Sequence, residues 1–78
     1  MKKEINELLN KEMSLVKLSN ELVTLGYGDF FEQIGDLEEI IDLGSVTVDE
    51  ELNVWFTVVE ANEELSETIV KINSFDEV

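Results

Sequence analysis

The stretch IIDLGSVTVDEELNVWFTVVE, residues 40–60, decides the fold because the spacing of its apolar residues changes at Gly44. Before Gly44, apolar residues recur at the spacing of a helix. After it, residues 46–48 alternate between valine and threonine, and residues 53–59 are rich in β-branched and aromatic side chains, which is typical of strands. The sequence therefore predicts helices first and strands second.

The helical part is predicted over residues 1–43. No glycine or proline precedes Gly26, and two rows of apolar residues on different faces meet near Ser14. Residues 2–25 are therefore either one kinked helix or two, the second capped by Ser14. Gly26 should end it, and Asp29 is well placed to start a further helix that closes at Gly44.

A β-meander of three antiparallel strands is predicted over residues 45–74, with turns at 49–51 and 61–66 and fraying from 75 to 78. Nothing in the sequence resembles a linker, so residues 1–78 are expected to form a single domain. We predict an α+β fold in which two or three N-terminal helices pack on one face of a three-stranded antiparallel sheet, in the order ααβββ.

Charge is the most unusual property of the chain. It contains 19 acidic residues against five lysines and arginines, a formal net charge of −14. Residues 1–25 carry four lysines and four glutamates, whereas residues 26–78 carry one lysine and fifteen acidic residues. Such a surface repels nucleic acid and anionic membranes and attracts basic proteins. We therefore expect a basic, nucleic-acid-binding protein as the partner, and no direct binding to nucleic acid or membrane.

The acidic residues follow a pattern. Four of them fall in one row of the helix predicted after Gly28, opposite an apolar stripe of Phe30, Ile34, Leu37 and Ile41. Both predicted turns are acidic as well, which favours a binding surface over a merely solvated helix face. The candidate partner-binding residues are Asp29, Glu32, Asp36 and Glu39 of the row, Asp49, Glu50, Glu51, Glu60, Glu63, Glu64, Leu65 and Glu67 of the turns, and Trp55.

Trp55 alternates with Val54 and Phe56 along a predicted strand, so it points to the opposite side of the sheet. If Val54 and Phe56 face the helices, Trp55, Val59 and Ile69 form an apolar patch on the open face that is suited to a homodimer or another partner. Alternatively, Trp55 belongs to the core. The sequence leaves both arrangements open.

Catalytic signatures are missing from the sequence, which has no cysteine and no histidine. Its four glycines do not form a phosphate-binding loop, and residues 49–51 lack the spacing of a calcium loop. We expect no enzymatic activity, no catalytic residue, no cofactor and no metal site. No apolar run is long enough to span a membrane, and the first three residues are followed by Glu4 and not by a signal-peptide core. The predicted location is the cytoplasm.

A short, cysteine-free, strongly acidic α+β chain rich in Lys, Glu, Ile and Asn resembles the small inhibitor proteins encoded by phages and mobile elements. This class includes anti-CRISPR proteins, anti-restriction proteins and uracil-DNA glycosylase inhibitors, many of which resemble DNA in charge. The resemblance covers size and composition and includes no shared motif. It implies a stoichiometric inhibitor in the cytoplasm of a bacterial host that occupies the basic nucleic-acid channel of an enzyme, with a CRISPR effector as the first candidate. The alternatives are an antitoxin or immunity-type protein that neutralises a basic toxin, and a small dimeric assembly module.

Overall fold

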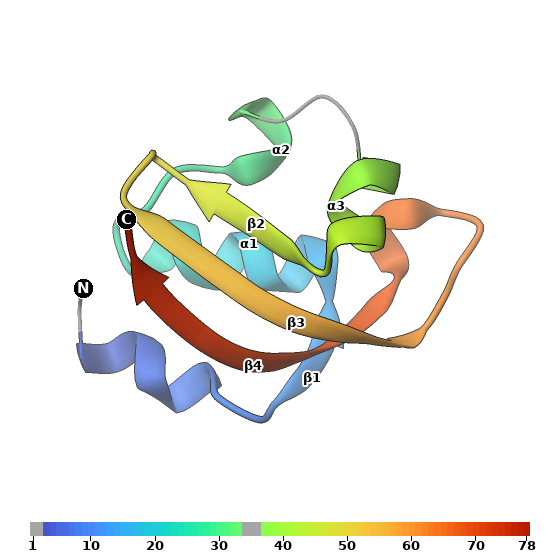
Figure 1. Ribbon diagram of the computed structural model, residues 1–78, viewed down its shortest axis with the longest axis horizontal. Coiled ribbons are helices and arrows are strands. Elements are labelled where there is room, and N and C mark those ends of the chain that lie inside the picture. Colours follow the sequence, from blue (N-terminus) through green and yellow to red (C-terminus); the bar gives the residue numbers. More distant parts are fainter. Residues whose placement is uncertain (1–2, 34–36) are drawn as a thin grey trace.

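The computed structural model describes residues 3–33 and 37–78, except the side chains of residues 32 and 33. Four strands form one antiparallel sheet in the order β1-β4-β3-β2 (Figure 1). The α+β class is confirmed, but the sheet has four strands and not three. In chain order the elements are η1 (a 3-10 helix, Lys3–Leu8), β1 (Glu12–Ser14), α1 (Leu15–Thr24), α2 (Phe30–Gln33), α3 (Leu37–Leu43), β2 (Ser45–Val48), β3 (Leu52–Glu60), η2 (a 3-10 helix, Leu65–Glu67) and β4 (Ile69–Glu77).

The additional strand, β1, lies inside the segment predicted to be helical, so the order ααβββ is wrong. Asn10 has a φ of 65°, which turns the chain out of η1. Its backbone N–H donates to the carbonyl of Ile72 at 2.8 Å, and the N–H of Ile72 donates to the carbonyl of Lys11 at 3.0 Å. β1 then continues the pairing, with Met13 opposite Val70. Pairing with the distant strand β4 therefore overrides the helical spacing of this segment.

The predicted break near Ser14 is confirmed. Ser14 is extended, with φ −69° and ψ 157°, and its hydroxyl accepts a hydrogen bond from the backbone N–H of Lys17 at 3.2 Å. This is the N-cap geometry that satisfies a free N–H in the first turn of a helix. The end predicted at Gly26 is also confirmed, because Gly26 has a φ of 96° and the N–H of Tyr27 donates to the carbonyl of Leu22 at 2.9 Å.

The helix predicted from Asp29 to Gly44 is described as two short helices, α2 and α3, with residues 34–36 between them outside the described part. Its predicted ends are confirmed, since Asp29 precedes α2 and Gly44, at φ 68°, follows α3. The predicted apolar stripe is only partly correct. Phe30 is buried, and Leu37 and Ile41 are partly buried against the core, but the fully buried residue of α3 is Ile40, which is outside the predicted stripe. Ile34 lies outside the described residues.

One face of the sheet carries the core. Helix α1 lies behind the sheet in Figure 1, and the inward side chains of β3 and β4 are buried against the helical layer. β4 extends to Glu77, so the predicted fraying from residue 75 is wrong. Phe75 lies opposite Val54 and is buried, which holds the end of the chain in the sheet. The buried apolar residues are Ile5, Leu8, Met13, Leu15, Leu18, Leu22, Tyr27, Phe30, Ile40, Val46, Val48, Leu52, Val54, Phe56, Val70, Ile72 and Phe75.

Candidate functional site

Most acidic side chains that the structure describes are exposed, and only Glu21 and Asp29 are half-buried. Among the described residues, no three of them are arranged to hold a metal ion. No helix in the described part of the chain is long and apolar enough to cross a membrane. Most of the described acidic side chains are thus available at the surface of the protein. Where each of them lies on the fold is described next.

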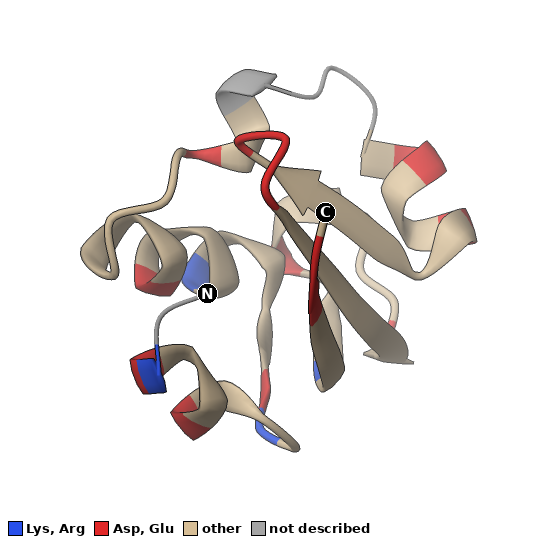
Figure 2. Cartoon of the chain, turned by 60° about the vertical axis from the view of Figure 1, so that its left-hand side comes forward, with Lys and Arg blue, Asp and Glu red and all other residues tan. Residues whose placement is uncertain are grey.

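The first acidic group is the acidic tip, which we define as Asp49, Glu50, Glu51, Asp76 and Glu77. The β2–β3 turn and the end of β4 meet here, both red in Figure 2. They meet because β3 pairs with β4 in a register that sets Leu52 opposite Glu77. The backbone N–H of Val78 also donates to the carbonyl of Glu51 at 3.0 Å. Exposed acids from two distant segments are therefore held together.

Asp49 also has a structural role in the acidic tip. Its carboxylate accepts a hydrogen bond from the backbone N–H of Gly28 at 2.6 Å, which ties the β2–β3 turn to the connection between α1 and α2. Asp49 and Glu50 have φ values of 54° and 58°, the left-handed conformation of a tight hairpin turn. The turn is therefore fixed in place, and Glu50 and Glu51 are presented from a defined backbone.

The second acidic group is the far acidic loop, which we define as residues 60–67 and which contains Glu60, Glu63, Glu64 and Glu67. The loop is ordered by short-range bonds: the side chain of Asn62 accepts from the N–H of Glu64 at 2.9 Å, and buried Thr68 accepts from the N–H of Asn62 at 3.3 Å. Leu65 is half-buried in η2, which packs near α1 and α3. Leu65, the apolar residue among the predicted partner-binding residues of this loop, is therefore only partly accessible to a partner.

The two acidic groups lie at opposite ends of β3. This strand has nine residues, and at about 3.3 Å per residue its ends are separated by roughly 26 Å. One end joins the acidic tip and the other enters the far acidic loop. The predicted turn residues therefore form two separate patches and not one continuous site.

Of the four residues in the predicted helical row, the structure describes the side chains of Asp29 and Glu39. Asp29 precedes α2, where its carboxylate accepts hydrogen bonds from the hydroxyl of Ser19 at 3.0 Å and the N–H of Phe31 at 2.8 Å. Glu39 is exposed on the separate helix α3. Asp36 lies outside the described residues, as does the side chain of Glu32. Asp29 therefore has a structural role, since it caps α2 and joins it to α1.

Trp55 lies on the open face of the sheet and is 42% exposed, whereas Val54 and Phe56 are buried. Its indole N–H donates to the carboxylate of Asp76 at 2.9 Å. The neighbouring side chains on this face are mainly polar; for example, the amide of Asn73 donates to the hydroxyl of Thr57 at 2.8 Å. Trp55 is thus an exposed indole in a mainly polar face, and its bond to Asp76 orients it beside the acidic tip.

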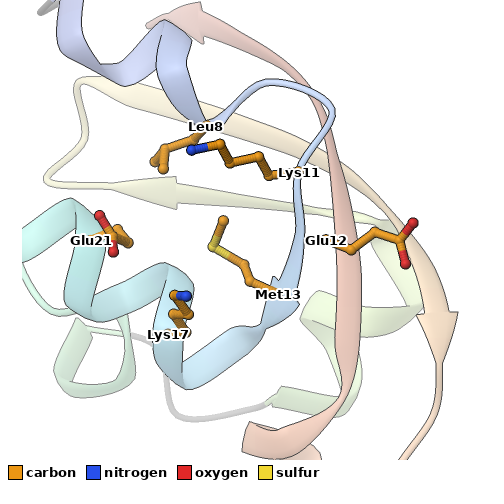
Figure 3. A pocket seen from close by; sticks show the side chains of 6 residues that line it. All are labelled: Leu8, Lys11, Glu12, Met13, Lys17 and Glu21. Atoms are coloured by element: carbon orange, nitrogen blue, oxygen red, sulfur yellow. The ribbon is translucent and has the colours of Figure 1, made fainter.

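Lys11 and Lys17 lie near the β1 edge of the sheet, opposite the β2 edge. A cleft of about 240 Å³ between η1, β1 and α1 is lined by Leu8, Lys11, Glu12, Met13, Lys17 and Glu21. Figure 3 shows Met13 at its centre and the ammonium groups of Lys11 and Lys17 reaching into it, whereas the carboxylate of Glu12 points away. We call this hollow the lysine cleft. Two lysines and two glutamates line it, so this corner is close to neutral and contrasts with the acidic groups at the two ends of β3.

Sequence reasoning missed two contributors to the acidic surface. The sequence predicts that Asp76 and Glu77 belong to a fraying end, but β4 includes both residues. The alternation of apolar and polar residues continues past Asn73, with Phe75 as an apolar residue that needs a buried position. Leu43 closes α3 and is 65% exposed, which the apolar spacing of its helix did not suggest. The continued alternation could have placed the two acids in β4, but no sequence signal marks Leu43 as exposed.

Comparison of the sequence with protein-family models found no match, and comparisons with curated proteins and with solved structures found none either.

Proposed function

We propose that this protein is an acidic inhibitor that occupies the basic nucleic-acid-binding channel of a DNA- or RNA-processing enzyme, with a CRISPR effector nuclease as the first candidate. The observation that carries the proposal is the exposed acidic surface at both ends of β3, in a segment of 53 residues that contains a single lysine. Solubility alone favours a net charge of only about 2 to 8 units in a small domain.

The dimensions of the surface support the same function. The acidic tip and the far acidic loop are separated by roughly 26 Å along β3, a length that matches about eight phosphates at 3.4 Å spacing along one strand of DNA. Each exposed carboxylate contributes little by itself, but a complementary field speeds association about 10- to 1000-fold at low salt. A groove built for phosphates would thus attract this surface.

The polarity of the molecule sets its orientation. The region around the lysine cleft has as many lysines as glutamates and would not be attracted by a basic channel, so β1 and the start of α1 should face away from the partner. Trp55 is the candidate anchor, because binding energy in interfaces concentrates in buried aromatic side chains. Its bond to Asp76 places it beside the acidic tip.

Order of addition tests this proposal. A purified CRISPR effector loaded with guide RNA is given the protein either before or after target DNA, and both DNA cleavage and DNA binding are measured. Inhibition should be strong when the protein is added first and much weaker when DNA is already bound. Equal inhibition in both orders, with DNA still bound, would contradict occupation of the channel.

A second function is favoured by the exposure of Trp55. An indole that is 42% exposed on an open sheet face also suits a homodimer, as in an assembly module, or a contact with a basic toxin. Sedimentation equilibrium of the wild type and of Trp55→Ala separates these possibilities. If the wild type and Trp55→Ala are both monomers, the protein is not a dimeric assembly module. Binding to a basic toxin but to no nuclease would favour the antitoxin function.

A further inference from the structure

Trp55 lies among short side chains on the open face of the sheet. Ser45 of β2 is opposite it on one side and Ser74 of β4 on the other, and the side chains of directly opposite residues share a face of the sheet. Neither serine is large enough to cover an indole ring. With 42% of its surface exposed, Trp55 therefore offers part of its ring to a partner.

The ring is also held in one orientation. Its N–H donates to Oδ2 of Asp76 at 2.9 Å, so the one hydrogen-bond donor of the indole is satisfied. Farther along β3 on the same face, the hydroxyl of Thr57 accepts a hydrogen bond from the amide of Asn73 at 2.8 Å. What Trp55 still offers a ligand is the π-electron system of its ring, next to a carboxylate.

A bulge in β4 brings this carboxylate to the indole. The register shifts by one residue between Trp55 and Phe56, which leaves Asn73 as an extra residue in β4. After the bulge, Phe75 is buried and Asp76 is exposed on the open face. Bulges recur next to functional sites, where they redirect a side chain. Here the bulge places an acid beside an exposed aromatic ring.

The charge around the indole selects a cation as the ligand. Asp76 belongs to the acidic tip, whose exposed carboxylates attract cations. Tryptophan is also the aromatic side chain that binds a cation best over its ring. Lys71, the single lysine of residues 26–78, lies opposite Thr57, on the side of Trp55 away from the acidic tip. A phosphate group or a second copy of this chain would bring negative charge to the contact, which opposes both.

We infer that Trp55 and Asp76 form a binding site for an arginine side chain of a basic partner protein. A guanidinium group is planar, so it stacks on the indole and donates to the acceptor positions that remain on the carboxylate. The ammonium group of lysine is a compact, strongly hydrated charge and makes the poorer ligand. The inference rests on the proposed function for the anchoring role of Trp55, and it adds the type of side chain that the anchor binds.

Two peptides of equal length and charge test the inference without a nucleic-acid enzyme. One repeats arginine and glycine, the other repeats lysine and glycine, and both carry fluorescein so that binding is followed by anisotropy. The wild type should bind the arginine peptide about fivefold more tightly than the lysine peptide. Because both peptides experience the same net charge of the protein, the ratio of the two affinities reports the contact with Trp55 and Asp76.

Protein variants locate the contact. Trp55→Leu keeps an apolar side chain but removes the indole, and it should reduce the preference for arginine to less than about twofold. Asp76→Asn removes the charge but keeps an acceptor for the indole N–H, and it should also reduce the preference. Glu12→Gln is the matched control, since it removes an exposed charge from β1, two strands away from Trp55. It should leave the preference unchanged.

NMR locates the site in the wild type as well, because Trp55 is the only tryptophan of the chain. Its indole N–H signal should shift more with the arginine peptide than with the lysine peptide at equal fractions bound. The inference is overturned if both peptides bind equally, if Trp55→Leu keeps the full preference, or if the indole signal shifts without peptide as protein concentration rises, since a second copy then covers the ring.

The two proposals fail separately. A preference for arginine that depends on Trp55, together with equal inhibition in both orders of addition to the nuclease, would contradict the proposed function and support this inference. Inhibition only when the protein is added before DNA, with no preference for arginine, would support the proposed function and overturn this inference.

Discussion

The first 25 residues and the remaining 53 differ in charge far more than in their share of the core. Both supply buried residues, such as Ile5 and Leu18 from the first part and Val54 and Ile72 from the second. Yet the first part is neutral and the second has a net charge of −14. Apart from structural acids such as Asp29 and Asp49, the acidic residues lie outside the core, and we propose that their concentration on one part of the surface reflects what that surface binds.

The largest change in stability is expected from a substitution in the core of the neutral part, residues 1–25. Ile5 lies in a short 3-10 helix yet is fully buried. Ile5→Ala should lower the free energy of unfolding by about 2 to 5 kcal/mol, because it leaves a cavity in the core. Urea unfolding followed by the fluorescence of Trp55 measures this. Val23→Ala on exposed α1 is the control and should change little; equal stability of both variants would show that η1 does not complete the core.

A smaller effect should separate structural acids from binding acids within the acidic tip. Asp49 and Glu50 share the left-handed backbone conformation, but the bond to Gly28 is made by Asp49. Asp49→Ala should lower the free energy of unfolding by about 1 to 2 kcal/mol more than Glu50→Ala, because it loses the bond to Gly28 and because aspartate tolerates the left-handed conformation better than alanine. Urea unfolding of the pair measures the difference. Equal losses would mean that the carboxylate of Asp49 does not hold the turn.

Local patterns in the sequence were sufficient for the elements that depend on local chemistry. Ser14 as a cap, Gly26 and Gly44 as ends, and Asp29 as a start are set by hydrogen bonds within a few residues. The placement of Trp55 on the open face followed from strand alternation once the buried face was known.

The parts that the sequence did not predict depend on contacts between distant residues. β1 exists because β4 offers it a partner, and three residues are too few to show a strand period. The acidic residues of the turns form two patches because β3 is nine residues long and separates them. Two acidic residues, Asp29 and Asp49, also hold parts of the chain together through hydrogen bonds. None of these contacts is encoded in the local pattern of apolar residues.

The smallest stability effect is expected from salt. Repulsion among the exposed acids of residues 26–78 should be reduced in about 0.5 M sodium chloride, where the screening length is below about 5 Å. The melting temperature should therefore rise by a few degrees between low salt and about 0.5 M. Circular dichroism across a salt series measures it. A steady fall would show that attractive pairs, and not repulsion, dominate the surface.

Competition between DNA and two charge-matched variants tests the central claim most directly. One variant carries Glu50→Gln, Glu51→Gln and Glu63→Gln in the acidic part, and the other carries Glu4→Gln, Glu7→Gln and Glu12→Gln in the neutral part; all six side chains are exposed. Each protein is added at increasing concentration to a guide-loaded CRISPR effector, and labelled DNA is added afterwards. Anisotropy then gives the protein concentration that prevents half of the DNA binding. We expect the first variant to need about tenfold more protein than the wild type and the second less than about twofold more. An equal change in both, or no change in either, would contradict the assignment of binding to the acidic part.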